Sequence, residues 1–461
     1  MGEKVVISLD IGTSKLAALA LSCKSLRPVA ICSQVNDTQI KELPAGYHEQ
    51  DPLRSRALCL GLLQKLLSDK KVRADEVVGI GITGQMHGVL LVNSDLEPQS
   101  NLITWRDQRT QNSEFRTRHS KRTGSPLHTG YGGATLRWLA KNGKLSENAT
   151  ALTIADYVAA HLTGVIATEA THAASWGIFN LQEGLWDAEL VDRLGIDKDV
   201  LPSVLSTARP LGNIRPALAQ QLGLGPDVQV CSPLGDNQAG IIGAAGFAGN
   251  AAVLNLGTGG QISFPQNDYK FVETLETRPM PFGGFILVGA SLCGGWAYKY
   301  LQKFIQATVK EFAGTQPGDE EIYSRMNSIA AEAPQGASGI SVDTRFSGTR
   351  LEPNIRGSIN GIGAENFTPA NLTRGFVEGM IRELAEMASK AGIKDFKKII
   401  AGGNAVRKNP VVSEVIESIF GLPCYISSSR EEAALGAAYA AAIGLGLISK
   451  DDIRPNLEKS R

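Results

Sequence analysis

Several common signatures are missing from the 461-residue sequence. Basic and acidic side chains are equal in number, 46 of each, so no excess charge predicts a nucleic-acid or anionic-membrane surface. The six cysteines include no C-x-x-C pair, and the six histidines include no H-x-x-x-H pair. We therefore expect a reduced interior, with neither a disulfide framework nor a structural zinc site.

Segments that would target or anchor the chain are missing as well. The opening residues, MGEKVVISLD, carry charges where the apolar core of a signal peptide would lie. The longest apolar stretch, 433–448, is too short to span a membrane and consists mainly of alanine and glycine, which is typical of close helix packing. We expect a soluble, cytoplasmic protein.

Strand-like and helix-like segments alternate along the chain, which predicts an α/β fold. Helices are expected where a capping residue precedes proline and an apolar face follows, at the Asp-Pro, Thr-Pro and Asn-Pro pairs that begin at 51, 368 and 409. Strands are expected between them, at 77–82, 88–92, 251–256, 285–290 and 397–403.

The two halves of the sequence resemble each other weakly. SLDIGTSKLAALAL (8–21) is answered by AVLNLGTGGQISF (252–264), and each predicts a strand, a Gly-Thr turn and a second strand. Each half later supplies a glycine-rich strand end, at 79–85 and 399–405. Two such halves predict a cleft that holds a nucleotide between two lobes, with a chance coincidence of Gly-Thr turns as the alternative.

The length of the chain exceeds one compact domain. Residues 236–250 are rich in glycine and alanine, and we expect them to cross between the lobes. The expected lobes are residues 1–245 and residues 246–461.

The first Gly-Thr turn has the chemistry of a phosphate site. Asp10, Gly12, Thr13 and Ser14 supply backbone N–H groups, two hydroxyls and a carboxylate that could hold a metal-bound water, although an ordinary hairpin turn is the alternative. GIGITG at 79–84 does not predict a dinucleotide site, because a strand follows it where that motif requires a helix. No P-loop motif occurs, so the paired turns point to the architecture of actin and the sugar kinases.

Motifs along nearly the whole chain resemble the FGGY family of carbohydrate kinases. They follow one another in order, as DIGTS (10–14), QMHG (85–88), TWRDQR (104–109), GDNQ (235–238), LGTG (256–259) and GGNA (402–405). The resemblance implies two ribonuclease-H-like lobes, with sugar bound mainly by the first and ATP mainly by the second. It also implies Mg²⁺-dependent transfer of a phosphoryl group from ATP to a terminal sugar hydroxyl.

Asp236 and Asp10 are the expected catalytic residues. A carboxylate beside an alcohol can take its proton during attack on the γ-phosphorus, and Asp236 follows an apolar run where a purely structural carboxylate is less expected. A helix N-cap is the alternative for Asp236. Asp10 is expected to face the γ-phosphate and to hold Mg²⁺ through water.

The resemblance assigns the remaining site residues to sugar or to nucleotide. Polar groups at a strand end, with methionine as an apolar wall, suit a polyol, and the sugar-binding set is Gln85, Met86, His87, Trp105, Asp107 and Asn237. The nucleotide-binding set is Gly12, Thr13, Ser14, Lys15, Gly257, Thr258, Gly402, Gly403 and Asn404. A satisfied core histidine and a simple strand-to-helix turn are the alternatives for His87 and for residues 402–404.

Two positions depart from the pattern of the family. A lysine usually stands seven residues after the first aspartate, where this chain has Ala17, and Lys15 lies on the same strand face and could substitute. The family's Asp-Gly-Arg is replaced by Asp107-Gln108-Arg109, which adds a side chain near the sugar site.

The leading expectation is phosphorylation of a ketose, with sedoheptulose first and xylulose, ribulose or another polyol as alternatives. A nucleotide-switched scaffold of the actin kind would use the same lobes without needing polar groups at 85–87 and 236–237. The presence of both Asp10 and Asp236 argues against an inactive sugar-binding regulator. We expect ATP, Mg²⁺ and a small sugar as ligands, no nucleic-acid or membrane partner, and a monomer or homodimer.

Overall fold

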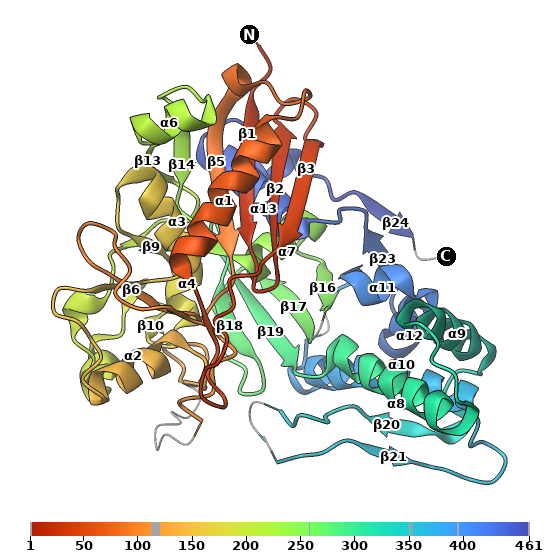
Figure 1. Cartoon of the computed structure of the whole chain (residues 1–461). Coiled ribbons are helices and arrows are strands. Elements are labelled where there is room, and N and C mark those ends of the chain that lie inside the picture. Colours follow the sequence, from red (N-terminus) through yellow and green to blue (C-terminus); the bar gives the residue numbers. More distant parts are fainter. Residues whose placement is uncertain are drawn as a thin grey trace.

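The computed structural model describes residues 2–111, 120–257, 259–349, 352, 354–393 and 396–459. Two seven-stranded sheets with helices packed on them organise the chain (Figure 1). The first sheet is built from residues before 236 and the second from residues after 250. The predicted α/β class and the arrangement in two lobes are therefore confirmed.

The first sheet has the order β13-β14-β5-β1-β2-β3, and β15 pairs separately with β5. β1 and β2 form an antiparallel hairpin, whereas β1, β14 and β15 all run parallel to β5. Side chains on both faces of β1 are buried, which is typical of a central strand in an α/β sheet. The strands are β1 (Val5–Ile11), β2 (Lys15–Ser22), β3 (Pro28–Val35), β5 (Val77–Gly84), β13 (Pro210–Asn213), β14 (Gln229–Cys231) and β15 (Leu234–Gly235).

One face of this sheet packs against α1 (Pro52–Leu67), α3 (Ile154–Thr163) and α6 (Pro216–Leu222). Helix α1 begins where the sequence predicts. Asp51 Oδ1 accepts hydrogen bonds from the backbone N–H groups of Leu53 and Arg54, and proline occupies the first turn, where its missing N–H costs nothing.

The second sheet has the order β18-β19-β17-β16-β22-β23-β24. The predicted strand at 251–256 matches β16, and the other two predicted strands of this lobe are confirmed to within one residue at each end. The strands are β16 (Ala251–Leu256), β17 (Gly260–Gln266), β18 (Glu276–Pro279), β19 (Phe285–Ser291), β22 (Lys398–Gly402), β23 (Cys424–Ser427) and β24 (Leu457–Lys459).

Four helices form one apolar core with the second sheet: α8 (Gly294–Ala313), α9 (Asp319–Glu332), α10 (Pro369–Lys390) and α12 (Pro410–Phe420). The predicted starts of α10 and α12 are confirmed, because Thr368 and Asn409 cap them with side-chain hydrogen bonds. Gly421 ends α12 in a left-handed conformation, as its position after the apolar run predicts.

The two sheets repeat one local plan. β1 is antiparallel to β2 and parallel to β5, and β16 is antiparallel to β17 and parallel to β22. Gly12 follows β1, and Gly257 follows β16. The weak internal similarity of the sequence therefore has a structural basis.

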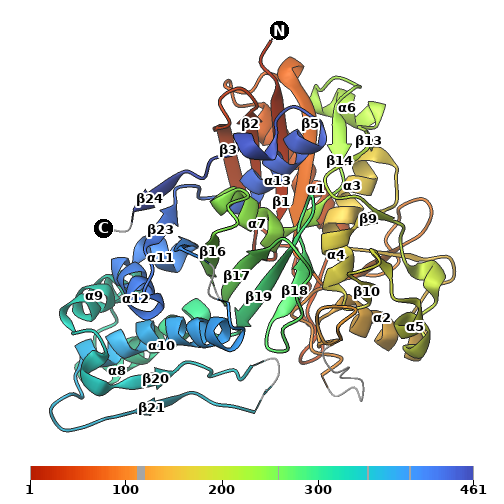
Figure 2. The ribbon, with the colours of Figure 1, turned by 180° about the vertical axis from the view of Figure 1, so that it is seen from behind.

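Two helices join the lobes by crossing each other (Figure 2). α7 (Asp236–Ala245) follows the first sheet but packs partly on the second, and α13 (Glu432–Gly444) lies between strands β23 and β24 of the second sheet but covers the first. A Cβ added at Gly243 would lie 1.9 Å from the Glu432 carbonyl oxygen, and one at Gly436 would lie 1.8 Å from that of Ala239. Close packing of the alanine and glycine stretch, as predicted, brings the two backbones into contact.

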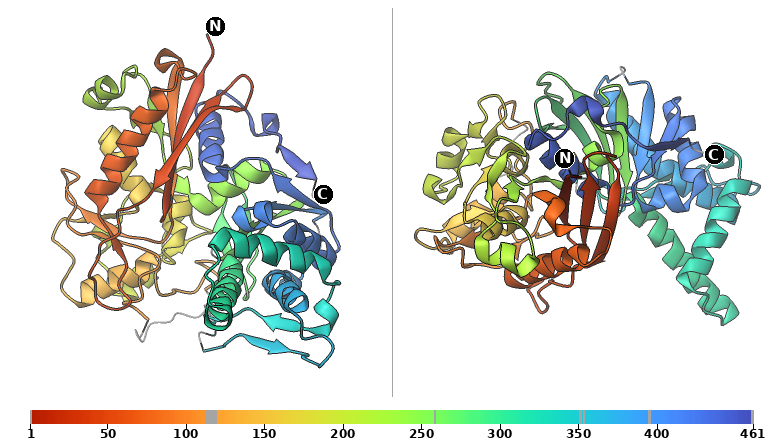
Figure 3. Two further views of the ribbon diagram at one scale, coloured as in Figure 1. Left: turned by 45° about the vertical axis from the view of Figure 1, so that its right-hand side comes forward. Right: turned by 90° about the horizontal axis from the view of Figure 1, so that it is seen from above.

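Shorter elements extend the first lobe. Apart from α13, which packs on the first sheet, the two halves of the chain occupy opposite sides of the molecule (Figure 3). The predicted strand at 88–92 is wrong in its extent, because residues 86–88 form a tight turn and only β6 remains. The short elements of the first lobe include α2 (Gly132–Lys141), α4 (Ala170–Ser175), β4 (Glu49–Gln50), β6 (Leu90–Val92), β7 (Leu102–Ile103) and β8 (Thr150–Leu152), and the second lobe has the short helix α11 (Asn404–Lys408).

Within the described ranges, no helix has both the length and the apolarity that crossing a membrane requires. All six cysteines are free.

Replacing Gly436 by alanine tests the crossing of α7 and α13. The new Cβ would clash with the backbone oxygen of Ala239, so we expect the free energy of unfolding to fall by about 1–3 kcal/mol or more. The control is Gly61→Ala in the middle of α1, where an added Cβ meets nothing within 4 Å. Alanine's helix propensity should make that variant more stable by up to about 1 kcal/mol. Equal denaturation midpoints for the two variants would contradict the close contact.

Candidate active site

Three strands of the first sheet end at one edge. β1, β5 and β15 are parallel neighbours, with β5 in the middle. Asp10 lies near the end of β1, Gln85 directly follows β5, and Asp236 directly follows β15. The carboxyl ends of parallel strands are where α/β sheets bind ligands. The fold thus brings both predicted catalytic aspartates and the predicted sugar-binding segment to one place.

The environment of the two carboxylates shifts their pKa values upward. The pKa of Asp10 is raised to about 8, chiefly by burial and then by the charges of Asp236 and Glu431, while Lys15 lowers it. Burial raises the pKa of Asp236 to about 6, although Arg278 and nearby backbone N–H groups lower it. At neutral pH Asp236 is ionised and can accept a proton, whereas Asp10 holds a proton until a cation compensates its charge.

The alternative that Asp236 is the N-cap of a helix is wrong. The cap of α7 is Gly235, and Asp236 is the first residue inside the helix. The Asp236 carboxylate therefore lies in the first turn of α7, and Asp236 is not the residue that caps the helix.

The carbonyl groups of the turn after β1 are bound by two other side chains and one backbone group. Asn36 Nδ2 donates to the Gly12 oxygen at 2.8 Å, and Gln50 Nε2 donates to the Thr13 oxygen at 2.9 Å. The Asn36 N–H donates to the Ser14 oxygen at 3.0 Å. Protein groups thus bind the carbonyl oxygens of this turn. The backbone N–H groups of such a turn are the donors that could bind an anion.

The Thr13 hydroxyl links this turn to the predicted sugar side. It donates to Gln85 Oε1 at 3.1 Å and accepts from Trp105 Nε1 at 2.9 Å. Gln85 Nε2 in turn donates to Gln50 Oε1 at 2.8 Å. Thr13, Gln85 and Trp105, which the sequence assigns to different ligands, form one connected network.

His87 has a strained backbone conformation. Its φ of 71° lies in the left-handed region, and the Gly88 N–H closes the turn on the Met86 carbonyl at 2.9 Å. Ser175 holds this turn, because its Oγ accepts from the His87 N–H at 3.0 Å and its carbonyl oxygen lies 2.6 Å from Nδ1. Because a carbonyl oxygen can only accept a hydrogen bond, Nδ1 carries a proton and donates it to Ser175. Such strain clusters at functional sites. Sugar binding by His87 stays a prediction.

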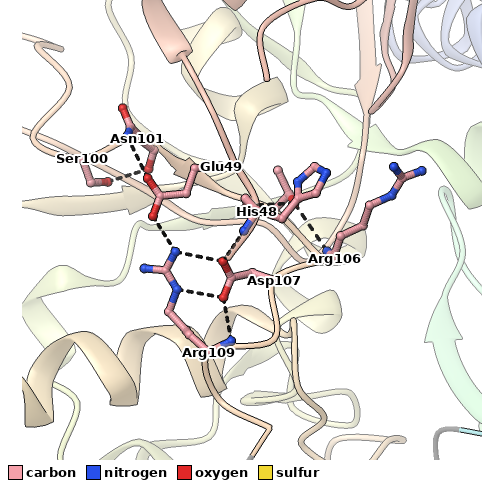
Figure 4. Close-up of polar contacts among 8 residues, drawn as sticks. His48, Glu49, Ser100, Asn101, Arg106, Asp107 and Arg109 are labelled. Carbon is pink, nitrogen blue, oxygen red and sulfur yellow. Dashed lines mark hydrogen bonds and ion pairs between the residues drawn. The ribbon is translucent and has the colours of Figure 1, made fainter. Parts of the chain in front are cut away.

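Protein groups occupy the Asp107 carboxylate (Figure 4). Its two oxygens pair with the Arg109 guanidinium at 2.7 and 2.8 Å, and the His48 N–H donates to Oδ2 at 2.7 Å. Arg109 also pairs with Glu49. Asp107 thus anchors the loop that carries Trp105, and the contact predicted between Asp107 and a sugar hydroxyl stays a prediction.

Lys15 lies on the strand face that Asp10 shares. Asp10 pairs with Ala17 across the hairpin, and Lys15 stands two residues before Ala17, in agreement with the expected face. Lys15 Nζ forms an ion pair with Glu431 Oε2 at 2.6 Å, and Glu431 directly precedes α13. The Glu431 carboxylate thus pairs with the ammonium group of Lys15. A role for Lys15 in place of the missing lysine stays a prediction.

The predicted nucleotide residues of the second half also lie at the ends of parallel strands. Gly257 follows β16, and Gly402 ends the neighbouring strand β22. Gly403 has a φ of 94°, and a Cβ there would lie 2.4 Å from the backbone oxygen that ends β16, so this position requires glycine. Asn404 begins α11. Thr258 lies outside the described residues.

Sequence reasoning missed the glycines that begin α8. A Cβ at Gly294 would lie 2.4 Å from the Gly259 backbone, and the Gly295 N–H donates to the Gly257 oxygen at 3.0 Å. The N-terminus of this 20-residue helix therefore abuts the second Gly-Thr turn, where its dipole favours an anion. A Gly-Gly pair before an amphipathic helix is the signal that could have located this contact.

A second missed group consists of Tyr131, Glu276 and Arg278. Arg278 Nη1 donates to Asn237 Oδ1 at 3.2 Å across 41 residues of sequence, and the Tyr131 ring stacks on His87 with centroids 4.3 Å apart. Tyr131 and Glu276, which are hydrogen-bonded to each other, are 145 residues apart. No local motif marks contacts of this range.

Asp10 is the residue that fits a divalent cation. Its Oδ1 is buried without a hydrogen-bond partner, and a nearby positive charge would stabilise its ionised form. In the described part of the chain, no three histidine, cysteine, aspartate or glutamate side chains form a metal cluster. A site with few protein carboxylates suits Mg²⁺, which keeps several waters and binds substrate phosphates.

The architecture defines a class of fold: two α/β lobes of the kind shared by actin and the sugar kinases. The N-terminal domain of the FGGY family of carbohydrate kinases matches residues 5–243, and its C-terminal domain matches residues 252–445. The chain belongs to the FGGY family of carbohydrate kinases. Of the classes that the sequence left open, the comparisons support a kinase, which uses ATP, and not a scaffold.

Relatives in this family act on more than one sugar. Sedoheptulokinase of Mus musculus is 27% identical, over 94% of this chain and 96% of that protein. The xylulose kinase of Haemophilus influenzae is also 27% identical, over 94% of this chain and 90% of that protein. The chain is therefore as similar to a xylulose kinase as to sedoheptulokinase. These comparisons assign it to the carbohydrate kinases without selecting one sugar.

Solved structures agree with the fold. A ligand-bound xylulose kinase from Lactobacillus acidophilus superposes with a TM-score of 0.83 at 26% identity, covering 99% of this chain and 93% of that chain. A gluconate kinase from the same organism has a TM-score of 0.86 at 24% identity and the same coverage. The two-lobed fold is thus the fold of solved sugar kinases.

Asp10→Asn tests the burial of the first carboxylate. Because the folded-state pKa is raised, the stability associated with this group is fully present below about pH 4 and is lost as the pH rises through about 8. We expect the Tm of D10N, without nucleotide or metal, to exceed that of the wild type by a margin that widens between these pH values. Asp95→Asn, on an exposed turn, is the control. A margin that does not depend on pH would contradict the burial of Asp10.

Proposed function

We propose that this carbohydrate kinase transfers the γ-phosphoryl group of ATP to a terminal hydroxyl of a ketose. The observation that carries the proposal is the meeting of Asp10, Asp236 and residues 85–87 at the ends of three parallel strands. This arrangement supports a role for Asp10 at the metal and phosphate and a role for Asp236 at the sugar hydroxyl. Residues 85–87 form the polar turn that would bind the sugar.

In this proposal residues 1–245 form the sugar-binding lobe, and residues 246–461 form the ATP-binding lobe. The sugar-binding residues are Gln85, Met86, His87, Trp105, Asp107 and Asn237. The nucleotide-binding residues are Gly12, Thr13, Ser14, Lys15, Gly257, Thr258, Gly402, Gly403 and Asn404. The strand-end position of Gly257, Gly402 and Gly403 on the second sheet supports this division of work.

Asp236 acts as the general base. Its pKa of about 6 leaves it ionised at neutral pH, so its carboxylate can take the proton of a hydroxyl that lies within hydrogen-bond reach. The hydroxyl oxygen forms its bond to the γ-phosphorus while the bond to the bridging oxygen of ADP breaks, and the proton remains on Asp236 until solvent removes it.

The chain's other groups position the phosphates. Backbone N–H groups of residues 12–14 bind phosphate oxygens, and the N-terminus of α8 beside Gly257 favours the negative charge. Asp10 would hold Mg²⁺ through water, and the cation would supply positive charge both to the phosphates and to this buried carboxylate, whose ionised form it would favour.

Sedoheptulose is the first substrate to test, with xylulose and ribulose as alternatives. Relatives named for sedoheptulose and for xylulose are equally similar to this chain, and both sugars are ketoses with a terminal primary hydroxyl. We also propose a cytoplasmic location, which the six free cysteines support.

A substrate panel tests this proposal. We expect ADP release with Mg-ATP to be highest, in kcat/KM, for one of sedoheptulose, xylulose and ribulose, with glycerol and gluconate as comparators that are not ketoses. If only glycerol or gluconate reacts, the ketose proposal is wrong while the family assignment stands.

The same panel should be run with Asp236→Asn. Asparagine keeps the shape of the side chain but cannot act as the base, so we expect kcat to fall at least about 100-fold while sugar affinity changes only a few-fold. Near-normal turnover by D236N would remove Asp236 from the mechanism.

A further inference from the structure

Strand β18 belongs to the second sheet, yet it is bound to the first lobe. It is the edge strand of its sheet and pairs with β19. The Thr277 N–H donates to the Gly124 carbonyl of the first lobe at 2.8 Å. Glu276 and Arg278 flank Thr277 on this strand. Their side chains therefore share one face of the strand, and the Thr277 side chain lies on the other.

Arg278 reaches residues that the sequence assigns to the sugar. Its Nη1 donates to Asn237 Oδ1 at 3.2 Å and lies 3.9 Å from Met86 Sδ. Its Nε and Nη2 bind Glu276 Oε2 at 3.1 and 2.6 Å. The guanidinium is thus held in a fixed orientation beside the start of α7, where Asp236 lies.

Glu276 connects Arg278 to His87. Its Oε1 accepts a hydrogen bond from the Tyr131 hydroxyl at 2.7 Å, and the Tyr131 ring stacks on His87 at 24° between planes. The Glu276 carboxylate therefore bridges the Arg278 guanidinium and the stacked rings of Tyr131 and His87.

The burial of this ion pair is not by itself evidence that it binds a ligand. The Arg278 and Glu276 side chains are 5% and 10% exposed, and Arg374 and Glu378 within α10 form a comparable pair at 1% and 4%. Buried ion pairs cost desolvation, and apolar residues of similar size are often as stable. The two pairs differ in their surroundings, because only the first contacts predicted sugar-binding residues.

We propose that Arg278 and Glu276, supplied by the second sheet, are specificity-determining residues of the sugar site. This inference rests on the proposed function. The ligand class is a polyhydroxy chain with neighbouring hydroxyls, because a guanidinium donates hydrogen bonds, a carboxylate accepts them, and a hydroxyl needs both. The neutral balance of the pair suits an uncharged sugar better than a sugar acid.

The position of β18 gives this assignment a consequence for ATP. The sheet continues from β18 through β19 and β17 to β16, which Gly257 follows. A sugar held by β18 and by residues 85–87 therefore restrains the second sheet against the first lobe. Sugar and ATP should each tighten the binding of the other, because such coupling is reciprocal.

Arg278→Met and Arg374→Met form a matched pair of variants. Each replaces one buried arginine of an ion pair in the second half, and both should lower the Tm. We expect R278M to raise the sugar KM and the calorimetric Kd for sugar about ten- to a hundredfold and to change the ratio of kcat/KM between two sugars of the panel. R374M should leave these quantities within twofold of the wild type. Arg278→Lys, which keeps the charge, should restore part of the loss.

The measurements use the sugar that the wild-type protein phosphorylates best, so failure of the ketose proposal leaves this test intact. If R278M does not fold, Glu276→Gln and R278K supply the same comparison. Sugar constants and sugar preference that change no more in these variants than in R374M would overturn the assignment and leave a structural ion pair. A change confined to the ATP constants would overturn it as well.

Discussion

Two enclosed carboxylates at the ends of parallel strands are the feature on which the rest of the site depends. Burial raises the pKa of both Asp10 and Asp236, and the charge of Asp236 raises that of Asp10 further. Each then requires a positive neighbour. Arg278 comes from the second sheet, and Lys15 is paired with Glu431 of the second half. The charge balance at the edge of the first sheet that holds Asp10 and Asp236 therefore involves residues of both lobes.

The crossing of α7 and α13 places this edge where the lobes meet. α7 begins at Asp236 and passes within backbone contact of α13, and the glycines at the crossing keep the two axes close. Rotation of the lobes about this contact would change the distance between Asp236 and the turn that follows β16. Such a contact of small residues is suited to closure that brings sugar and ATP together and excludes water.

Local sequence signals predicted many of the helices and strands, but they could not predict contacts between residues far apart in the sequence. The N-cap at Asp51 and the strand at 251–256 follow from neighbouring residues, so their limits could be predicted to within a residue. The tight turn at His87 shortened a predicted strand, because Ser175 stabilises a backbone conformation that no propensity favours. Tyr131 and Arg278 reach the site across the fold, and Asp107 is occupied by Arg109 through geometry that spacing alone does not reveal. The roles assigned to the site residues came from the resemblance to the family, because spacing alone does not reveal which ligand a side chain contacts.

The central claim is that Asp236 activates a sugar hydroxyl while water is kept from the γ-phosphate. Phosphorus NMR of a reaction with the preferred sugar tests it most directly, because a sugar phosphate and inorganic phosphate give separate signals. We predict one phosphomonoester for each ADP formed, and little inorganic phosphate even when sugar is omitted. Inorganic phosphate released at the same rate with and without sugar would contradict the claim.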